Sequence, residues 1–586
     1  MKLPSRLHNS KSHFLTQTLK TTPLILSTIL LAACGSDSSS GSAQNTTEAK
    51  STPDTTAPDT TTPDTTTPDT SQPSGSIKNV IMMIGDGMGP QQVGLLEDYV
   101  KRAPSDPYNG KNSAISTFAT QGTMALSMNG PHGSLVVDSA CSASQLATGV
   151  ASGSEMLGLD KDGNKVETIL EKAKAMGKAT GLVSDTRLTH ATPAAFASHQ
   201  RHRSLENDIA AEMLKDVQVD VMLSGGLRHW IPQGSDETST ELVNLINEPT
   251  VRIKSKRSDD TNLLVDAQNL GYSLAFNKTQ LANADDDKLL GLFAYSGLDN
   301  GITYSQNKGT AAQVQPSLKE MTQKALDVLS KDDDGFFLMI EGGQIDWAGH
   351  NNDTATMLHE LLKFDEAVQA VYDWVKDRND TLVLITADHE TGSFGFSYSR
   401  THLPTAQQLS GEAFQGHDYH PNFNFGALEN LDKIHNQSQS FSDFYYSEVA
   451  GNDLTPTQLM NKFNAISEFD ITVEQATQVL EMEDNVAKQE ADEKYGEHSY
   501  LSAAEFPKVD DFEEFYVYGN EIHTNLLGRK VAAGQNTVWG TGTHTSVPVP
   551  VIAWGPAEAI APYKGLMHHV KVGEVTIKAL TDSQAN

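Results

Sequence analysis

The sequence predicts an α/β protein with a largely parallel central sheet and helices between its strands. From Ile77 onward, short uninterrupted apolar runs recur along the chain, and each run ends in a polar cluster. Segments with helical periodicity separate these runs. Uninterrupted apolar strands are typical of parallel sheets, because helices cover both faces of such a sheet. The alternation therefore predicts an α/β core.

Five apolar runs are expected to form strands: Val80–Ile84, Thr180–Ser184, Val221–Ser224, Phe336–Ile340 and Thr381–Ile385. The expected helices include Lys165–Ala175, Ser317–Leu329 and Ala355–Val375. Ligands of open α/β sheets lie beyond the carboxyl ends of the strands. Because carboxylates and histidines follow several of these runs, the strand ends are the expected place of the functional site.

The first 34 residues have the character of a bacterial export signal. Basic residues precede a short apolar run, Pro23–Leu31, which is too short to span a membrane. The sequence Leu31-Ala-Ala-Cys34 resembles a lipobox, in which the cysteine is lipidated and becomes the first residue. We therefore expect residues 1–33 to be a lipoprotein signal peptide and Cys34 to anchor an exported protein to a membrane. Gly35 favours the outer membrane, on its periplasmic or cell-surface side.

Residues 34–76 begin with the expected lipidated Cys34 and continue as a Thr-, Pro- and Asp-rich segment. Proline recurs every five residues from Pro53 to Pro73 in a T-T-P-D-T repeat. Such a segment buries too little apolar surface to offset its ordering entropy, so we expect a disordered tether. Once Cys34 is acylated, Cys141 is the one remaining cysteine, and no intramolecular disulfide can form.

The chain is strongly acidic, with a formal net charge of −32 at pH 7. This charge argues against a nucleic-acid partner, because a phosphate backbone requires a basic surface. About half of it lies in residues 411–515, where 22 Asp and Glu face 5 Lys and Arg. We expect an acidic insertion over 401–538, with helices such as Val473–Gln489, between core segments 77–400 and 539–586. Its role as cap, lid or interface stays open, as does the choice between monomer and homodimer.

Two strand-end segments indicate anion and metal chemistry. Asp86 follows Val80–Ile84 and is flanked by glycines, which let a ligand come close to the backbone. Ser139 lies among small residues that suit a hydroxyl at a strand-to-helix junction. The N-terminus of that helix would supply N–H groups and positive potential for an anion. Judged locally, Ser139 is equally well explained as an ordinary N-cap.

Three further segments supply carboxylates and imidazoles. The run from Glu341 to His350 places Asp346 and His350 four residues apart, on one face of a helical turn. Asp388-His389 comes directly after a predicted strand, and His544 precedes another apolar run. A lone histidine at such a place is usually structural. The recurrence of the same donor types at successive strand ends indicates a metal centre instead.

These segments closely resemble the alkaline phosphatase family from about Val80 to Pro556, apart from the acidic insertion. Asp-Ser-Ala, E-G-x-x-I-D-x-x-x-H, A-D-H-E and a late T-H occur here in the family's order. The resemblance implies a three-layer sandwich and a hydrolase of phosphate monoesters that forms a phosphoserine intermediate. It also implies two Zn²⁺ and one Mg²⁺ as cofactors, with inorganic phosphate and an alcohol as products. Some marine bacterial members share the variations described below.

The resemblance assigns a role to each motif residue. The first zinc would be held by Asp346, His350 and His544, and the second by Asp86, Asp388 and His389 beside the nucleophile Ser139. The magnesium would be held by Asp86, Thr192 and Glu341. Arg203 would clamp the phosphate, with Arg201 as the alternative if the local spacing differs. Histidine with carboxylate suits zinc, whereas carboxylate with hydroxyl oxygen suits magnesium.

Some positions vary within the family. His190 is expected beside the magnesium and Trp347 beside the phosphate, where both would tune phosphate release and magnesium affinity rather than the reaction type. Ser144 replaces a common threonine. Cys141, two residues past the expected nucleophile, is expected to be a packed residue rather than a reactive thiol.

Other functions compete with this one. A sulfatase would need Cys- or Ser-x-Pro-x-Arg, and neither Ser139 nor Cys141 begins that motif. Related phosphodiesterases generally lack the Glu341 and Thr192 pair. A surface binding protein is supported mainly by the anchor and tether, and it would show no phosphatase activity.

Overall fold

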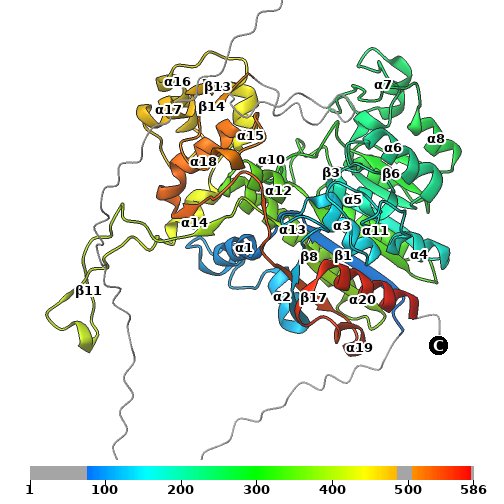
Figure 1. Cartoon of the computed structure of the whole chain (residues 1–586), viewed down its shortest axis with the longest axis horizontal. Coiled ribbons are helices and arrows are strands. Elements are labelled where there is room, and N and C mark those ends of the chain that lie inside the picture. Colours follow the sequence, from blue (N-terminus) through cyan, green and yellow to red (C-terminus); the bar gives the residue numbers. More distant parts are fainter. Residues whose placement is uncertain (1–75, 485–503, 583–586) are drawn as a thin grey trace, which may run out of the picture. The chain divides into compact units, whose positions relative to one another are not determined.

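The computed structural model describes residues 76–484 and 504–582 (Figure 1). All described residues belong to the second of the two units into which the chain divides, residues 70–586. The expected signal peptide, Cys34 and all of the expected tether but its last residue lie outside the described residues. Among the helices in the described ranges, none combines the length and apolarity needed to cross a membrane.

The core of the second unit is a ten-stranded sheet in the order β18-β2-β17-β8-β1-β7-β3-β4-β6-β5 (Figure 1). Its strands are β1 (Asn79–Gly85), β2 (Thr123–Met128), β3 (Ala179–Arg187), β4 (Val221–Gly225), β5 (Ser273–Ala275), β6 (Leu289–Leu292), β7 (Phe336–Gly342), β8 (Thr381–Ala387), β17 (Val549–Trp554) and β18 (Gly565–His568). Neighbouring strands are parallel except where β17 pairs antiparallel with β2 and β8. The predicted largely parallel sheet is confirmed, and it contains all five predicted strands.

Alternate residues of the central strands face two separate hydrophobic clusters. In β1, Ile81 and Met83 belong to one cluster, and Val80, Met82 and Ile84 belong to the other. The first cluster includes α1 (Pro90–Arg102), α2 (Ala114–Gln121), α11 (Leu318–Leu329) and α13 (Thr354–Val375). The second includes α3 (Ser139–Thr148), α4 (Ile169–Ala175), α5 (Ala191–Ala197), α8 (Leu263–Asn269) and α20 (His569–Thr581). Helices therefore cover both faces, as uninterrupted apolar strands require.

Local capping determines where these helices begin. Ser317 caps α11 and forms a capping box with Glu320, so the helix starts where the sequence predicted. In α4, Thr168 and Glu171 form the same motif. That helix therefore begins at Ile169, later than the predicted Lys165, because the cap requires an extended residue immediately before the first turn.

The other described core elements are short. The helices are α6 (Glu206–Ala211), η1 (Glu212–Val217), η2 (Leu227–His229), α7 (Thr240–Ile246), α9 (Lys278–Asn283), α10 (Gly301–Asn307), α12 (Gln344–His350) and α19 (Ala557–Ile560). Small antiparallel pairs join β9 (Glu390–Thr391) to β16 (His544–Thr545) and β10 (Gly395–Phe396) to β15 (Thr537–Val538).

Residues 401–538 contact α1 and α13 of the core through α14, and their described parts form short helices and antiparallel strand pairs. They are β11 (Gln407–Gln408), η3 (Glu412–Phe414), β12 (Asp418–Tyr419), α14 (Glu429–His435), α15 (Phe441–Phe444), η4 (Tyr445–Val449), α16 (Pro456–Phe463), α17 (Val473–Val479), β13 (Met482–Asp484), β14 (Glu505–Pro507), η6 (Glu513–Phe515) and α18 (Ile522–Gln535). Phe441, Phe444 and Phe463 are buried against one another. They belong to the first hydrophobic cluster, so the insertion shares its apolar core with α1 and α13.

The predicted helix Val473–Gln489 is wrong in its extent. Helix α17 ends at Val479, and β13 follows at Met482–Asp484. This strand pairs antiparallel with β14 at Glu505–Pro507. Pairing with a segment distant in sequence outweighs the local helical periodicity there. Residues 485–489 lie outside the described part.

Candidate metal centre and active site

The sheet brings the predicted ligand residues to one edge. Strand β1 lies between β7 and β8 in parallel register. Asp86 follows β1, Asp388 follows β8, and Glu341 lies near the end of β7. Because the carboxyl ends of parallel strands meet at the same edge, three buried carboxylates come together there.

The turn after β1 depends on a glycine. Gly87 has a φ of +72°, and a Cβ at this position would lie 2.8 Å from the Thr391 Oγ1 and 2.9 Å from the Asp346 Cα. A larger residue would therefore be strained and would also collide with the metal-ligand candidates. The Gly87 amide donates a hydrogen bond to Oδ1 of Asp388 at 3.1 Å, which fixes that carboxylate.

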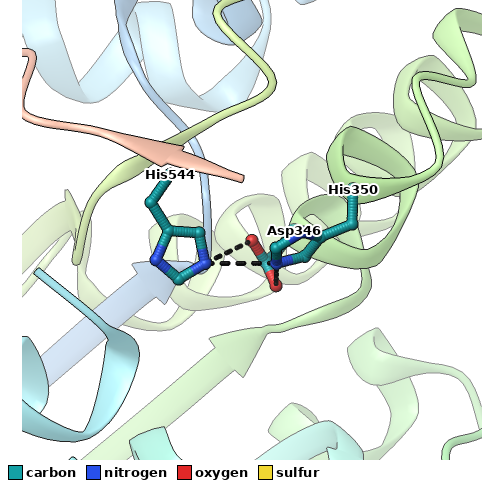
Figure 2. Close-up of side chains that lie close together, drawn as sticks. All are labelled: Asp346, His350 and His544. Carbon is teal, nitrogen blue, oxygen red and sulfur yellow. Dashed lines mark hydrogen bonds and ion pairs between the residues drawn. The ribbon is translucent and has the colours of Figure 1, made fainter. Parts of the chain in front are cut away.

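The first ligand group consists of Asp346, His350 and His544 (Figure 2). Helix α12 carries Asp346 and His350 one turn apart, with His350 Nε2 at 3.2 Å from Asp346 Oδ2. His544, from β16, brings its Nε2 to 3.1 Å from His350 Nε2 and 3.6 Å from Asp346 Oδ1. Residues from a helix and a distant strand thus converge on one point.

The hydrogen bonds of the two rings indicate a cation at that point. His350 Nδ1 lies 2.7 Å from the Gly542 carbonyl, and His544 Nδ1 lies 2.9 Å from the Val137 carbonyl. Since carbonyls only accept, each Nδ1 is the donor and each neutral ring keeps a lone pair on Nε2. Two lone pairs 3.1 Å apart repel unless a proton on one ring or a metal cation lies between them. In the ion-free chain, burial lowers the pKa of His350, but Asp346 outweighs burial and raises that pKa to about 9.

The second ligand group consists of Asp86, Asp388 and His389, all fully buried. His389 Nε2 lies 3.1 Å from Asp388 Oδ2 and 3.5 Å from Asp86 Oδ1, and neither oxygen has a hydrogen-bond partner within the described ranges. Burial and the charge of Asp346 raise the pKa of Asp388 to about 7. Buried, unpartnered carboxylate oxygens are costly unless a cation neutralises them.

A third group lies around Glu341. Its Oε1 is buried without a hydrogen-bond partner among the described residues, while Oε2 accepts from Ser184 and from Thr186. Burial raises the pKa of Glu341 to about 8. Thr192 Oγ1 lies 3.4 Å from Oδ2 of Asp86, so the predicted magnesium ligands are assembled.

His190 also reaches this third group. One of its ring nitrogens lies within 4.8 Å of ligand atoms of both Asp86 and Glu341. His190 is therefore placed to contact an ion directly or through water. It also packs edge-on against Trp347, with the ring centroids 5.9 Å apart. The two residues expected to tune the site thus touch each other.

Ser139 is the first residue of α3 and not its N-cap. Asp138 takes the N-cap position, and its side chain accepts hydrogen bonds from the amides of Ala140 and Cys141. The Ser139 Oγ lies 3.1 Å from His389 Nε2, inside the second ligand group. The local explanation of Ser139 as an N-cap is therefore wrong. Cys141 is packed, as predicted: it is fully buried, and its Sγ donates to the Ser152 carbonyl at 3.2 Å.

A cavity of about 530 Å³ opens above these groups. Ser139, Arg203, His190 and Trp347 line it, together with the first ligand group. Arg203 Nη1 donates to Asp138 Oδ2 at 3.1 Å, which holds the guanidinium beside the serine. Arg201 is exposed and does not line the cavity. The geometry thus favours Arg203 over Arg201 as the phosphate clamp.

Among the residues of this cavity that sequence reasoning missed are Tyr518 and Glu521. Both come from the acidic insertion and line the cavity wall. The Tyr518 ring lies edge-on to His350 at 5.0 Å, and burial raises the pKa of Glu521 to about 7. Neither lies in a pattern of a strand followed by ligands, so no local signal distinguished them from the surrounding acidic segment.

Comparison with known proteins identifies the family. The family model described as alkaline phosphatase matches residues 77–581. The chain belongs to the alkaline phosphatase family. Alkaline phosphatase 3 of Bacillus subtilis is 30% identical over 513 residues, covering 86% of this chain and 89% of that relative. Alkaline phosphatase 4 of the same organism is 36% identical over 323 residues, covering 54% of this chain but only 62% of the relative.

Solved alkaline phosphatases share the fold. The cold-active enzyme from a psychrophilic Shewanella sp. is 26% identical with a TM-score of 0.60, covering 86% of this chain and 99% of that one. The Thermus thermophilus enzyme, 24% identical, has a TM-score of 0.66 over 86% of this chain and 92% of its own, which supports the fold alone. The alkaline phosphatase family consists of metal-dependent phosphoric monoester hydrolases, as the sequence motifs predicted.

Proposed function

We propose that this chain hydrolyses phosphate monoesters through a phosphoserine intermediate on Ser139. The observation that carries the proposal is the 3.1 Å distance between Ser139 Oγ and His389 Nε2. It places a hydroxyl inside a group of unpartnered carboxylates, at the wall of a cavity that Arg203 also lines. A nucleophile, a cation to grip phosphate and room for an ester are thereby combined.

The donor atoms support two Zn²⁺ and one Mg²⁺ as the cofactors. The first two groups combine histidine with carboxylate, which suits zinc. The third offers carboxylates and the Thr192 hydroxyl, which suits magnesium. When bound, the zinc ions would lower the pKa of the attacking oxygen and stabilise the departing one.

The residues of the chain then perform the remaining steps. Arg203 binds two non-bridging phosphate oxygens through its planar guanidinium, which Asp138 holds in place. The Ser139 hydroxyl releases its proton to solvent as Oγ attacks phosphorus, the P–O bond to the alcohol breaks, and the leaving alkoxide takes up a proton from solvent. Water then attacks the phosphoserine, releasing inorganic phosphate and restoring the hydroxyl. His190 and Trp347, which line the cavity, would tune the release of phosphate.

The proposal is tested on the metal-loaded protein with p-nitrophenyl phosphate. Hydrolysis should be lost on chelation and restored by Zn²⁺ with Mg²⁺, and elemental analysis should give two zinc ions and one magnesium ion per chain. Rapid acid quenching should trap phosphate on the peptide that contains Ser139. Faster hydrolysis of bis(p-nitrophenyl) phosphate would identify a phosphodiesterase instead. Absence of any turnover would favour a binding protein.

A lipid anchor is a separate proposal that rests on the sequence alone. Leu31-Ala-Ala-Cys34 supports lipidation of Cys34 and export to the outer membrane. Labelled palmitate should enter the protein in cells, and a Cys34→Ser variant should lose the label and leave the membrane fraction. Retention of label by that variant would contradict the proposal.

A further inference from the structure

A second cavity, of about 490 Å³, adjoins the active-site cavity. Its walls come from α10, α12 and α13 of the core and from α15, η4 and α18 of the insertion, together with the loops that precede α10 and α18. Trp347 and Glu521 line both cavities. Trp347 directly follows the ligand candidate Asp346. The second cavity therefore borders the place where an ester would be cleaved.

The charge of the second cavity has one sign. Five carboxylates line it, and its lining contains no Lys, Arg or His side chain. Two of the carboxylates have structural roles. Asp353 caps α13 and also accepts a hydrogen bond from the Phe441 amide at 2.7 Å. Glu360 accepts a hydrogen bond from the Gly301 amide and forms an ion pair with Lys363 at 2.5 Å.

Two other carboxylates have no such role. The side chains of Asp299 and Glu521 accept no hydrogen bond from the described part of the chain, and Oε2 of Glu521 is buried. Lys363, which approaches Asp299, is already paired with Asp185 at 3.1 Å and with Glu360. Partly buried carboxylates without partners are stabilised by a cation that enters the cavity.

Aromatic rings complete the lining. Trp347, Tyr445 and Tyr446 face the same cavity. Tyr445 is held by stacking on His523, with ring centroids 5.4 Å apart, and Tyr446 accepts a hydrogen bond from Asn520 at 3.0 Å. Aromatic faces combined with carboxylates bind organic ammonium groups.

The dimensions argue for an organic cation over a metal ion. Among the described His, Cys, Asp and Glu side chains, every group close enough to hold a metal lies in the active site described above, and none lies in this cavity. Its carboxylates are thus too dispersed to enclose a small ion, whereas a cavity of about 490 Å³ accommodates a bulky ammonium.

We propose that the second cavity is a subsite for the alcohol part of the substrate. It selects phosphate monoesters whose alcohol carries an organic ammonium group. The inference rests on the proposed function, because it assigns the substrate class of that same active site.

The experiment compares phosphocholine with 3,3-dimethylbutyl phosphate, which has the same shape but a carbon in place of the quaternary nitrogen. With the intact metal-loaded enzyme, kcat/KM should be about tenfold higher for the charged ester, the size of one desolvated cation–aromatic contact. Asp299→Asn should lower this preference at least about threefold, as should Tyr446→Ala. Glu474→Gln, which removes the same charge from an exposed insertion site outside the cavity, should leave the preference unchanged.

The outcomes separate this inference from the proposed function. Equal kcat/KM for the two esters, with p-nitrophenyl phosphate still hydrolysed, would overturn the subsite alone. An unchanged preference in both Asp299→Asn and Tyr446→Ala would also overturn it. If none of the three esters is hydrolysed by the metal-loaded protein, the proposed function itself fails.

Discussion

The two sides of the active-site cavity come from regions with different architectures. On the core side, neighbouring strands and the helices that follow them carry the carboxylates, the serine and most of the histidines. On the insertion side, Tyr518 and Glu521 come from a loop between η6 and α18. The register of a ten-stranded sheet positions the first set, whereas packing among short helices positions the second.

This difference indicates a division of labour. Groups that must be placed to within fractions of an ångström for bond making lie at the ends of hydrogen-bonded strands and on the helices that follow them. Several groups that the proposed subsite assigns to the alcohol, such as Tyr446 and Glu521, lie on the insertion, which can change without disturbing the sheet. Variants at Ser139, Arg203 and the ligand candidates should therefore affect chemistry, whereas variants at the insertion residues of the two cavities should affect substrate preference or docking of the insertion.

The largest effect is expected at the core nucleophile. Ser139→Ala should lower kcat for p-nitrophenyl phosphate by at least about 10³-fold, because the phosphoserine can no longer form. Ser152→Ala is a matched control, since it removes a buried serine hydroxyl that has no hydrogen-bond partner within the described ranges. A Ser139→Ala enzyme with a normal rate and no trapped phosphoserine would refute the mechanism.

The next effect concerns the phosphate clamp. Arg203→Ala should lower kcat/KM by about 10²-fold. Arg203→Lys should show a smaller loss but should not reach the kcat/KM of the unmodified enzyme, because a lysine cannot make the bidentate contact. The competing candidate supplies the control: Arg201→Ala should stay within about twofold of the unmodified enzyme, because Arg201 is exposed. The reverse pattern would transfer the role to Arg201.

Substitutions on the insertion side of the cavity should lower kcat/KM less than substitutions on the core side. Tyr518→Ala removes the ring that lies edge-on to His350, and kcat/KM should fall by about three- to tenfold. Tyr398→Ala, at an exposed site in the chain leading into the insertion, should change nothing measurable. If Tyr518→Ala lowered kcat/KM as strongly as Ser139→Ala lowers kcat, the proposed difference in role between the core and the insertion would be contradicted.

The contact between the two regions should depend on pH. His359 of α13 donates from Nε2 to the His435 carbonyl of α14, and burial lowers the pKa of His359 to about 4. A histidine in the unfolded chain has a pKa of about 6.5. Between pH 6.5 and pH 4 the folded chain therefore binds fewer protons than the unfolded chain. The stability supplied by neutral His359 is thus complete above pH 6.5 and is lost as the pH falls toward 4.

Unfolding by urea at pH 7 and pH 4.5 measures this dependence. The drop in unfolding free energy on acidification should be smaller by roughly 2 kcal/mol in His359→Gln than in the unmodified protein. The exposed His132 provides the control as His132→Gln, which should keep the full drop. An identical drop in all three proteins would show that His359 does not contribute to the pH dependence.

The sequence predicted the core well because its signals are local. Each predicted strand is an uninterrupted apolar run, and Asp86, Glu341 and Asp388 follow such runs, so the order of these motifs alone places the three carboxylates at one edge. Helix α11 begins where the N-cap residue Ser317 predicts, because a capping signal is also local.

The insertion was harder to predict because its determinants are distant in sequence. The strand β13 exists because it pairs with β14, beyond residues 485–503, and local periodicity predicted a helix there. Glu521 lines the cavity because the loop before α18 packs against α12. The acidic sequence around Glu521 does not indicate this packing. Ser139 is likewise the first helical residue only because Asp138 occupies the N-cap position.

Asp86 connects the second and third ligand groups through its two carboxylate oxygens, one toward His389 and one toward Thr192. Burial and the neighbouring acids raise its pKa well above the usual range. A cation that binds at either group lowers this pKa, so the ion that binds second meets a carboxylate that binds its proton less strongly. Proton release on metal uptake should therefore be unequal between the two steps, which makes the two ions thermodynamically linked.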